Sequence, residues 1–348
     1  MHVTFDPADP LDAPFRTAIE DVLTAIMNTR RAEVVADAPS LGAVVDLLTP
    51  LAVQGKHVRP AFVWWAYVAV AGEPNDPAAL LRLAASLDLT HAGLLAHDDL
   101  IDSADVRRSA PSMHCAVAAL SPQPDPALGL AGAVIGGSWL LQWAQQAFDE
   151  CGLELTPASR LAFNKMRSRV LTGQMADSWA AAGLPSRGAS IDDLKTASYT
   201  VVGPTQLGAL VAGGDEEQLT AFAAPLGRAY QARDDVLGVF GRPAATGKPV
   251  GDDLRRGKLT TLVQSALTLA HPRDAAALRA VLGDADASDA DIAHATHIIS
   301  GCGALDEVEA SIARDLEQAL DALDQEQLAP AGNEGLRGLA IACVDRDH

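Results

Sequence analysis

Residues 97–108 read HDDLIDSADVRR and place three aspartates, Asp98, Asp99 and Asp102, in a stretch that is otherwise apolar. On a helix each residue advances by about 100°, so Asp98 and Asp102 lie one turn apart on one face, with Asp99 beside Asp98. Carboxylates grouped in apolar surroundings repel one another and are costly to desolvate. A divalent cation removes that cost, and Mg²⁺ is the hard cation that prefers one or two carboxylates together with phosphate oxygens.

Two arginines, Arg107 and Arg108, follow the aspartates. A guanidinium matches phosphate geometry with two parallel hydrogen bonds, so this pair indicates a phosphate clamp beside the cation. The alternative is a solvated helix face. The chain has 45 acidic residues, so a DDxxD pattern arises easily by chance, and the arginines would then only pair with it.

A second acidic pair occurs far along the chain. Residues 230–241, YQARDDVLGVFG, carry Asp234 and Asp235 in another apolar helical run, with Gln231 one turn before them. Carboxylates on different helices of a bundle can face one another and hold a metal cluster. Two such pairs, each followed by basic residues, favour a metal site over chance.

Cations are spread along the chain at positions that suit diphosphate binding. GKHVRP (55–60) sets Lys56 and Arg59 three residues apart, and His91 lies one to two turns before the first aspartates. The other candidates are Lys195 with its neighbour Thr196, Lys248 and Lys258. A single lysine is more often a surface residue and a single histidine a core residue. Together these residues indicate a helical, Mg²⁺-dependent enzyme acting on one or two diphosphate esters.

The composition excludes several functional classes. The 348 residues carry a formal net charge of −19, which argues against nucleic-acid binding and against docking on anionic membranes. Four widely spaced cysteines form no CxxC pattern, so we expect a reducing, cytoplasmic location. The most apolar stretch, 128–144, is shorter than the ~20 residues of a membrane span. We therefore expect a buried core helix there and no stable membrane insertion.

Hydrophobic spacing predicts an all-α protein. Helical patterns occupy 15–27, 62–70, 80–95 and 306–325, and no period-two alternation is long enough for a strand. We expect one all-α domain over residues 1–348, with 1–40 as an N-terminal helical extension and ten or more helices in total. Breaks rich in proline or glycine are predicted at 71–78, 121–127, 182–190, 241–251 and 328–335.

In this order, the motifs resemble those of the trans-isoprenyl diphosphate synthases, the polyprenyl synthetase family that includes farnesyl and geranylgeranyl diphosphate synthases. The matching segments are GKHVRP, HAGLLAHDDLIDSADVRRSAPSMH, GQMAD, KTASYTVVGP, YQARDDVLGVFG and TGKPVGDDLRRGK. The resemblance runs from about residue 40 to the C-terminal VDRD. It implies a single large helical bundle of the isoprenoid synthase type, with a central cavity, that is usually a homodimer.

The resemblance also implies roles for individual residues. Asp98, Asp102 and Asp234 would bind Mg²⁺, about three ions per active site with Mn²⁺ as a substitute, and Asp99 and Asp235 would support them. The residues implied to bind isopentenyl diphosphate are Lys56, Arg59, His91 and Arg108. Those implied near the allylic diphosphate are Arg107, Lys195, Gln231 and Lys258, with Thr196 and Lys248 as further substrate-binding candidates. The implied catalytic set is Asp98, Asp99, Asp102, Arg107, Lys195, Asp234, Asp235 and Lys258.

The implied reaction is an Mg²⁺-assisted ionisation of the allylic diphosphate, attack by the double bond of isopentenyl diphosphate, and loss of a proton. Four positions depart from the usual pattern of the family. His57 stands where arginine is usual, Ser109 replaces a glycine, Ser138 replaces an aspartate, and Gly238 replaces the last aspartate of the second motif.

In the resembling family, the side chains four and five residues before the first aspartate help to set product length. Here they are Leu94 and Gly93, and Gly93 provides no bulky plug. We therefore expect a C20 product, geranylgeranyl diphosphate, with farnesyl (C15) or C25 and longer products as alternatives.

Two functions of another class stay open. A class I terpene cyclase also ionises an allylic diphosphate with Mg²⁺, but it would leave Lys56, Arg59 and Arg108 without a task. A non-catalytic partner subunit of a heterodimeric synthase generally lacks the first aspartate motif, which is intact here. A purely structural bundle would leave its buried carboxylates uncompensated.

Overall fold

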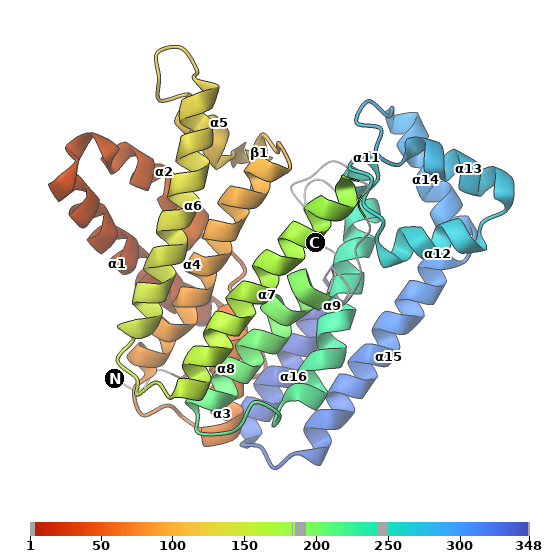
Figure 1. Ribbon diagram of the computed structural model, residues 1–348. Helices are drawn as coiled ribbons and strands as arrows, with labels where there is room; N and C mark the ends of the chain where they lie inside the picture. Colours follow the sequence, from red (N-terminus) through yellow and green to blue (C-terminus); the bar gives the residue numbers. More distant parts are fainter. Residues whose placement is uncertain (1–3, 183, 185–192, 242–249, 347–348) are drawn as a thin grey trace. The chain divides into compact units, whose positions relative to one another are not determined.

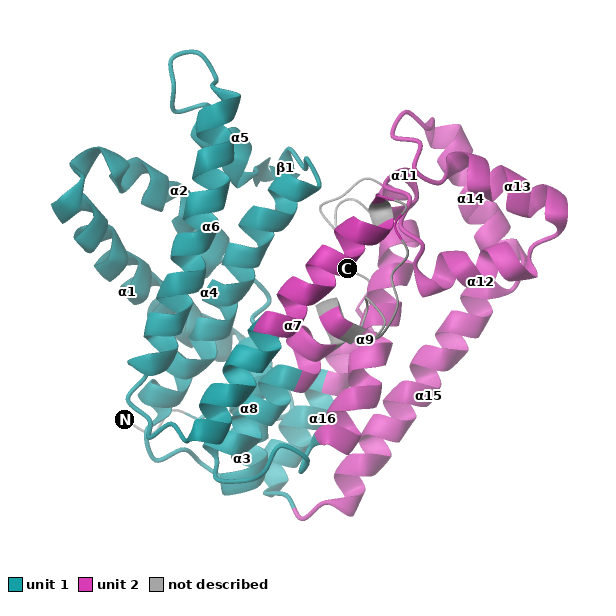
Figure 2. Cartoon of the chain, viewed as in Figure 1, with its two compact units in different colours: residues 1–167, 203–219, 328–339 teal, residues 168–202, 220–327, 340–348 magenta. Residues whose placement is uncertain are grey.

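The structure is a computed structural model that describes residues 4–182, 184, 193–241 and 250–346. Over these residues the chain forms 15 α-helices and one two-stranded hairpin, so the predicted all-α fold is confirmed (Figure 1). Two compact units are distinguished in Figure 2. Unit 1 comprises residues 1–167, 203–219 and 328–339, and unit 2 comprises residues 168–202, 220–327 and 340–348.

Unit 1 is built around two central helices, α3 (Val58–Ala71) and α4 (Pro77–Ile101). The elements around them are α1 (Ala13–Asp37), η1 (Pro39–Leu41), α2 (Gly42–Val53), β1 (Val106–Arg107), β2 (Ala110–Pro111), α5 (Met113–Ala118), α6 (Pro126–Asp149), the beginning of α7 (Pro157–Ala181), α8 (Gly203–Val211) and the beginning of α16 (Pro330–Val344). Most residues of α3 and of α4 are buried. Both helices are therefore apolar around most of their circumference, as expected of core helices.

Helix α1 illustrates how the sequence determines the local structure. Asp12 caps its N-terminus, since Oδ1 accepts a hydrogen bond of 2.7 Å from the backbone N–H of Phe15. Phe15, Ile19, Leu23 and Met27 recur every fourth residue and are fully buried. The helical pattern predicted at 15–27 is thus confirmed, and the stripe places α1 against α2 and α4.

Helices α4 and α6 approach closely because glycines face each other at their contact. A Cβ built on Gly93 would lie 2.8 Å from the carbonyl oxygen of Gly137, and one built on Gly137 would lie 2.9 Å from that of Gly93. Any larger side chain at either position would force the two helices apart. This contact holds the C-terminal half of α4 in place.

The expectation of a buried core helix at 128–144 is only half correct. Helix α6 buries its glycine-rich face but exposes Leu130 (53%), Val134 (45%) and Ile135 (51%). A helix that is apolar all round does not show in its sequence which of its faces packs against another helix. The predicted break at 328–335 is also partly wrong, since α16 begins at Pro330, a residue that suits the first turn of a helix.

Unit 2 contains the remaining elements. They are the end of α7, η2 (Asp193–Val202, π-helical), α9 (Thr220–Phe240), α11 (Asp252–Arg255), α12 (Thr261–Leu269), α13 (Pro272–Val281), α14 (Asp289–Gly301), α15 (Ala304–Gln325) and the end of α16. The pattern predicted at 306–325 is confirmed as α15. Helix α15 lies alongside α9, and Arg233 of α9 forms two hydrogen bonds of 2.7 Å with the carboxylate of Glu309 (Figure 1).

In the part of the chain that is described, two helices are long and apolar enough to cross a membrane by length and composition, α4 and α6. Of their most apolar windows, 72% and 44% respectively are buried inside the protein. Core helices of soluble proteins pass the same test, so these two helices are weak indications of a membrane span.

Candidate active site

The first aspartate motif lies where α4 ends. The backbone N–H of Asp102, the C-cap residue, bonds the carbonyl oxygen of Asp98 at 2.8 Å, so the two residues are one turn apart. Both are partly exposed, whereas Asp99 is 1% exposed. Two accessible carboxylates and one buried carboxylate therefore share the last turn of this helix.

The buried Asp99 anchors the hairpin that follows. Nε of Arg107 donates to both oxygens of Asp99, at 2.9 and 3.1 Å, and a second guanidinium nitrogen binds the same carboxylate. Burial acts to lower the pKa of Arg107, but the hydrogen bonds and charge of Asp99, with Asp98 and Asp102, raise it overall. Arg107 is therefore a fixed cation at the end of α4.

The hairpin turn itself consists of Arg108 and Ser109. Val106 pairs with Pro111 and Arg107 with Ala110, so only these two residues form the loop, and both have positive φ, 51° and 62°. Two-residue hairpin loops favour glycine or asparagine in this conformation. The hairpin could not be predicted from the sequence, because strands of two residues are too short to show an alternation of apolar and polar residues.

Four predicted cations of unit 1 belong to three elements that meet near the middle of α4. Arg59 comes from the first turn of α3, His91 from α4, and Arg107 and Arg108 from the hairpin. Burial, and then the charges of Arg59, Arg108 and Arg107, hold the pKa of His91 well below its usual value. This effect requires the three guanidinium groups to be near the imidazole, so they form a concentrated positive site.

The loop before α3 is tied to the same hairpin. A guanidinium nitrogen of Arg108 donates to the carbonyl oxygens of Leu51, at 3.3 Å, and Gln54. Lys56 lies in this loop and is exposed. The predicted isopentenyl diphosphate residues Lys56, Arg59, His91 and Arg108 are therefore all in unit 1, on elements that contact one another.

The second aspartate motif lies on α9 in unit 2. Asp235 is 3% exposed, and its carboxylate accepts hydrogen bonds from Nε2 of Gln231 at 2.7 Å and from the backbone N–H of Thr261 at 3.3 Å. Asp234 is partly exposed and forms an ion pair with Arg346, whose guanidinium also lies 3.9 Å from the ring centroid of Tyr230. Each carboxylate oxygen of Asp235 thus accepts a hydrogen bond within the protein, whereas Asp234 pairs with an arginine of the C-terminal segment.

Gly238, where the resembling family has a third aspartate, has no room for a side chain. A Cβ built there would lie 2.0 Å from Oδ2 of Asp253. Asp253 is 8% exposed and its Oδ1 is 3.5 Å from Nζ of Lys258. The carboxylate of Asp253, from the neighbouring α11, therefore occupies the space beside Gly238. The predicted residue Lys258 lies next to this carboxylate.

Some predicted residues cannot be placed. Lys248 lies outside the described residues, and only the backbone of Lys195 and Thr196, within η2, is described. Their assignment to the substrate site remains a prediction.

The residues expected to set product length are both in α4. Gly93 is buried against α6, where it contacts the backbone of Gly137, so the missing side chain is required for helix packing. Leu94 is partly exposed. Phe148 of α6 stacks on Phe163 of α7 with ring centroids 4.0 Å apart.

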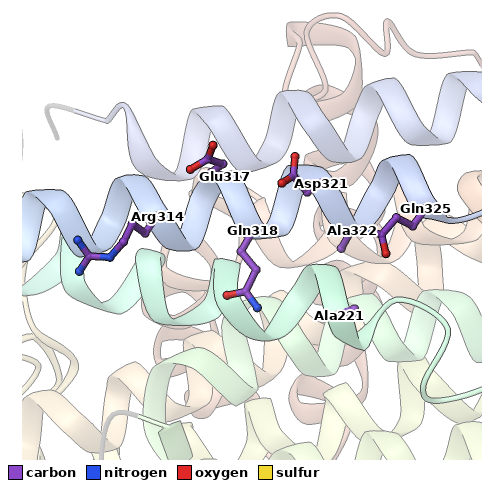
Figure 3. Close-up of a pocket in the computed structure, with 7 residues that line it drawn as sticks. All are labelled: Ala221, Arg314, Glu317, Gln318, Asp321, Ala322 and Gln325. Carbon is purple, nitrogen blue, oxygen red and sulfur yellow. The ribbon is translucent and has the colours of Figure 1, made fainter.

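A hollow of about 400 Å³ between α9 and α15 offers no alternative site (Figure 3). It is lined by Ala221, Arg314, Glu317, Gln318, Asp321, Ala322 and Gln325. One arginine among two carboxylates does not suit a diphosphate. Within the described residues, the one group of three or more closely spaced metal-ligand side chains is Asp105, His114 and Cys115, which contains no predicted ligand.

Three charged residues of these sites were not predicted from the sequence: Asp88, whose Oδ2 is 2.6 Å from Nδ1 of His57, Asp253 and Arg346. Asp88 is three residues before His91 on α4, so helical spacing alone could have placed it on the same face. Asp253 lies in the quoted segment GDDLRRGK, but its distance from Gly238 along the chain hides the contact. No local signal points to Arg346.

Three comparisons with known proteins bear on this arrangement. The family described as polyprenyl synthetase matches residues 43–299. The (2E,6E)-farnesyl diphosphate synthase of Mycobacterium tuberculosis is 32% identical over 307 residues, covering 84% of this chain and 80% of that protein. The geranylfarnesyl diphosphate synthase of Aeropyrum pernix is 30% identical over 296 residues, covering 82% and 88%.

Solved structures give the same result for the fold. A geranylgeranyl pyrophosphate synthase from Corynebacterium glutamicum, complexed with isoprenyl diphosphate and magnesium, matches with a TM-score of 0.89 and 34% identity, covering 95% of this chain and 98% of that one. The three relatives make products of different length by name, so the comparisons leave the product length open.

Proposed function

The chain belongs to the polyprenyl synthetase family and is a trans-isoprenyl diphosphate synthase, and on that premise we propose that it joins isopentenyl diphosphate head to tail to an allylic diphosphate and makes geranylgeranyl diphosphate (C20). One observation carries the proposal. In unit 1 the same helix, α4, presents His91 within a group of arginines and, further along, the partly exposed carboxylates of Asp98 and Asp102. A cation-rich site for one diphosphate and a carboxylate site for metal-bound diphosphate are what a two-substrate condensation needs.

The donor atoms fit Mg²⁺. Asp98 and Asp102 of unit 1 and Asp234 of unit 2 supply carboxylate oxygens, the ligands that this hard cation prefers. Oε1 of Gln231 is buried with no hydrogen-bond partner among the described residues, and it could accept a hydrogen bond from a water on the ion. Mg²⁺ held by Asp98 and Asp102 would draw charge from the leaving diphosphate. The structure of a relative complexed with isoprenyl diphosphate and magnesium supports this assignment.

The protein side chains position the reactants. Asp99 fixes Arg107, so a guanidinium is held at the end of α4 without loss of side-chain entropy when a phosphate binds. His91 is neutral because of its lowered pKa, so one ring nitrogen can donate a hydrogen bond and the other can accept one. Lys56, Arg59 and Arg108 supply the charge that neutralises isopentenyl diphosphate. Lys195, Thr196, Lys248 and Lys258 are proposed to serve the allylic diphosphate.

Product length is proposed to depend on Leu94. Gly93 packs against the backbone of α6, so this face of α4 is occupied by a contact between helices. The next residue, Leu94, has a partly exposed side chain.

We also propose a cytoplasmic homodimer. The exposed apolar residues Leu130, Val134 and Ile135 lie within two turns of α6, and a second copy of the chain would bury them. None of the four cysteines forms a disulfide in the structure, which suits a reducing compartment.

The test is a product assay with purified protein, Mg²⁺, labelled isopentenyl diphosphate and, in separate tubes, C5, C10 and C15 allylic diphosphates. The dephosphorylated products are sized by chromatography. A C20 alcohol from all three primers supports the proposal, and a C15 alcohol alone overturns the assigned length. Cyclic hydrocarbon without incorporation identifies a cyclase, and the absence of any turnover favours the partner-subunit function.

A further inference from the structure

His57 stands between Lys56 and Arg59, two residues proposed to bind isopentenyl diphosphate, and its side chain is completely buried. It is the N-cap residue of α3 and has a positive φ of 54°. Such a backbone conformation is uncommon for a residue with a side chain, and it persists only where surrounding contacts enforce it. The contacts of the imidazole therefore help to fix the path of this loop.

The imidazole lies between carboxylates from two other helices. Nδ1 is 2.6 Å from Oδ2 of Asp88 on α4, and Nε2 is 3.6 Å from Oε1 of Glu20 on α1. Nε2 is buried and has no hydrogen-bond partner among the described residues. A neutral imidazole carries only one N–H, so one lone pair would have to face a carboxylate. Only the imidazolium form complements both neighbours.

The loop is fixed at two points on either side of Lys56. Arg108 binds the carbonyl oxygen of Gln54 before it, and His57 binds Asp88 after it. Asp88 is one helical turn from His91, so the second anchor is attached to the same helix that carries the substrate residue. Loss of either anchor would let Lys56 and the first turn of α3 move away from the cation group.

We propose that His57, in its imidazolium form, is a positioning residue that holds Lys56 and Arg59 in the geometry that binds isopentenyl diphosphate. The proposal rests on the proposed function, because it concerns the second substrate of that reaction. The affinity for isopentenyl diphosphate should therefore fall as His57 loses its proton. An arginine, usual at this position in the resembling family, would not lose its charge.

The pH direction follows from the groups around His57. Burial acts to lower its pKa, but the hydrogen bond and charge of Asp88, and then Glu20, outweigh burial and raise the pKa above its usual value. The cations Arg108, Lys56 and Arg59 lie in the same region, as does the neutral His91. A raised pKa means that the imidazolium is present at and below the usual value of about 6.5 and is lost as the pH rises through the raised pKa.

The test compares wild-type enzyme with His57→Arg and His57→Gln between about pH 6 and 9. We expect the KM for isopentenyl diphosphate of the wild type to rise about tenfold relative to that of His57→Arg over this range, within the usual range of coupling between two sites. The KM of His57→Gln should be high at every pH. The kcat and the KM for the allylic substrate should follow the same pH profile in all three proteins, which removes the ionisation of the substrates from the comparison. His294→Gln, at an exposed position of α14, is the matched control.

A second measurement does not depend on the variants folding. The histidine resonances of wild-type protein are titrated by NMR with and without isopentenyl diphosphate, and His57 should titrate above the usual histidine value and shift further upward with the substrate. Equal pH profiles of wild type and His57→Arg, or a His57 that titrates at or below that value, would overturn the inference while leaving the synthase activity intact. No incorporation by wild type at any pH would instead overturn the proposed function.

Discussion

Gly238 provides a sharp test of how the second aspartate motif is built. The obvious way to restore the usual family pattern is Gly238→Asp. The structure predicts that this change is harmful, because a Cβ at this position would lie 2.0 Å from Oδ2, 2.6 Å from Cγ and 3.3 Å from Cβ of Asp253. Asp253 would have to rotate away, although it is 8% exposed and lies 3.5 Å from Lys258.

The magnitude follows from opposing effects. Overpacking costs about 1–3 kcal/mol, whereas replacing a glycine inside a helix by alanine gains up to about 1 kcal/mol. We expect Gly238→Ala to lower the free energy of unfolding by about 1–2 kcal/mol. Gly238→Asp also places a second carboxylate beside Asp253 and gains less helix propensity, so its loss should be about 2–4 kcal/mol.

The assay is urea denaturation of each variant, with the rate of product formation measured in parallel. Gly301→Ala in α14 is the control, because nothing lies within 4 Å of a Cβ built there, and its stability should be equal or higher. Asp253→Ala combined with Gly238→Ala should cost less than the sum of the single changes. If Gly238→Ala is as stable as Gly301→Ala, or if Gly238→Asp raises the rate, the reasoning is refuted.

Four further substitutions test other parts of the site. Ser109→Gly should raise the free energy of unfolding by about 0.5–1 kcal/mol, because Ser109 has a φ of 62° in a two-residue hairpin loop; a lower denaturation midpoint would contradict this. Asp98→Asn and Asp102→Asn should each slow Mg²⁺-dependent product formation by at least about 100-fold, whereas Asp105→Asn, whose side chain is 85% exposed, should not; wild-type rates in both variants would contradict the metal assignment. Leu94→Phe should shorten the main product from C20 towards C15 if Leu94 forms the floor, and an unchanged chromatogram would place the floor elsewhere. Gly93→Phe is a poorer test of the floor, because its side chain would collide with the backbone of α6.

The helices of the fold could be predicted from hydrophobic spacing because their stripes repeat over several turns. Phe15, Ile19, Leu23 and Met27 of α1 are an example, and all four are buried as the pattern requires. The start of α16 differs from the predicted break at 328–335, because proline and glycine also occur inside helices. Pro330 suits a first helical turn, and a Cβ on Gly335 would lie 2.3 Å from the ring of Trp65, so this glycine allows close packing.

The site could be predicted only where its chemistry is local in the sequence. The aspartates on α4 repeat at helical spacing, and the positions of Asp98 and Asp102 one turn apart follow from that alone. The contacts of His57 with Asp88, and of Gly238 with Asp253, join residues distant along the chain, so no window of the sequence contains both partners. For the same reason, the sequence could not show that the carboxylate of Asp253 fills the space beside Gly238, where the third aspartate is absent.

The most direct test of the central claim is to measure diphosphate release from an allylic diphosphate with and without isopentenyl diphosphate, in the presence of Mg²⁺. A head-to-tail synthase should release diphosphate only when both substrates are present, with one diphosphate freed for each isopentenyl unit incorporated. Release at the same rate without isopentenyl diphosphate would contradict the account, because the cations around His91 would then serve no second substrate.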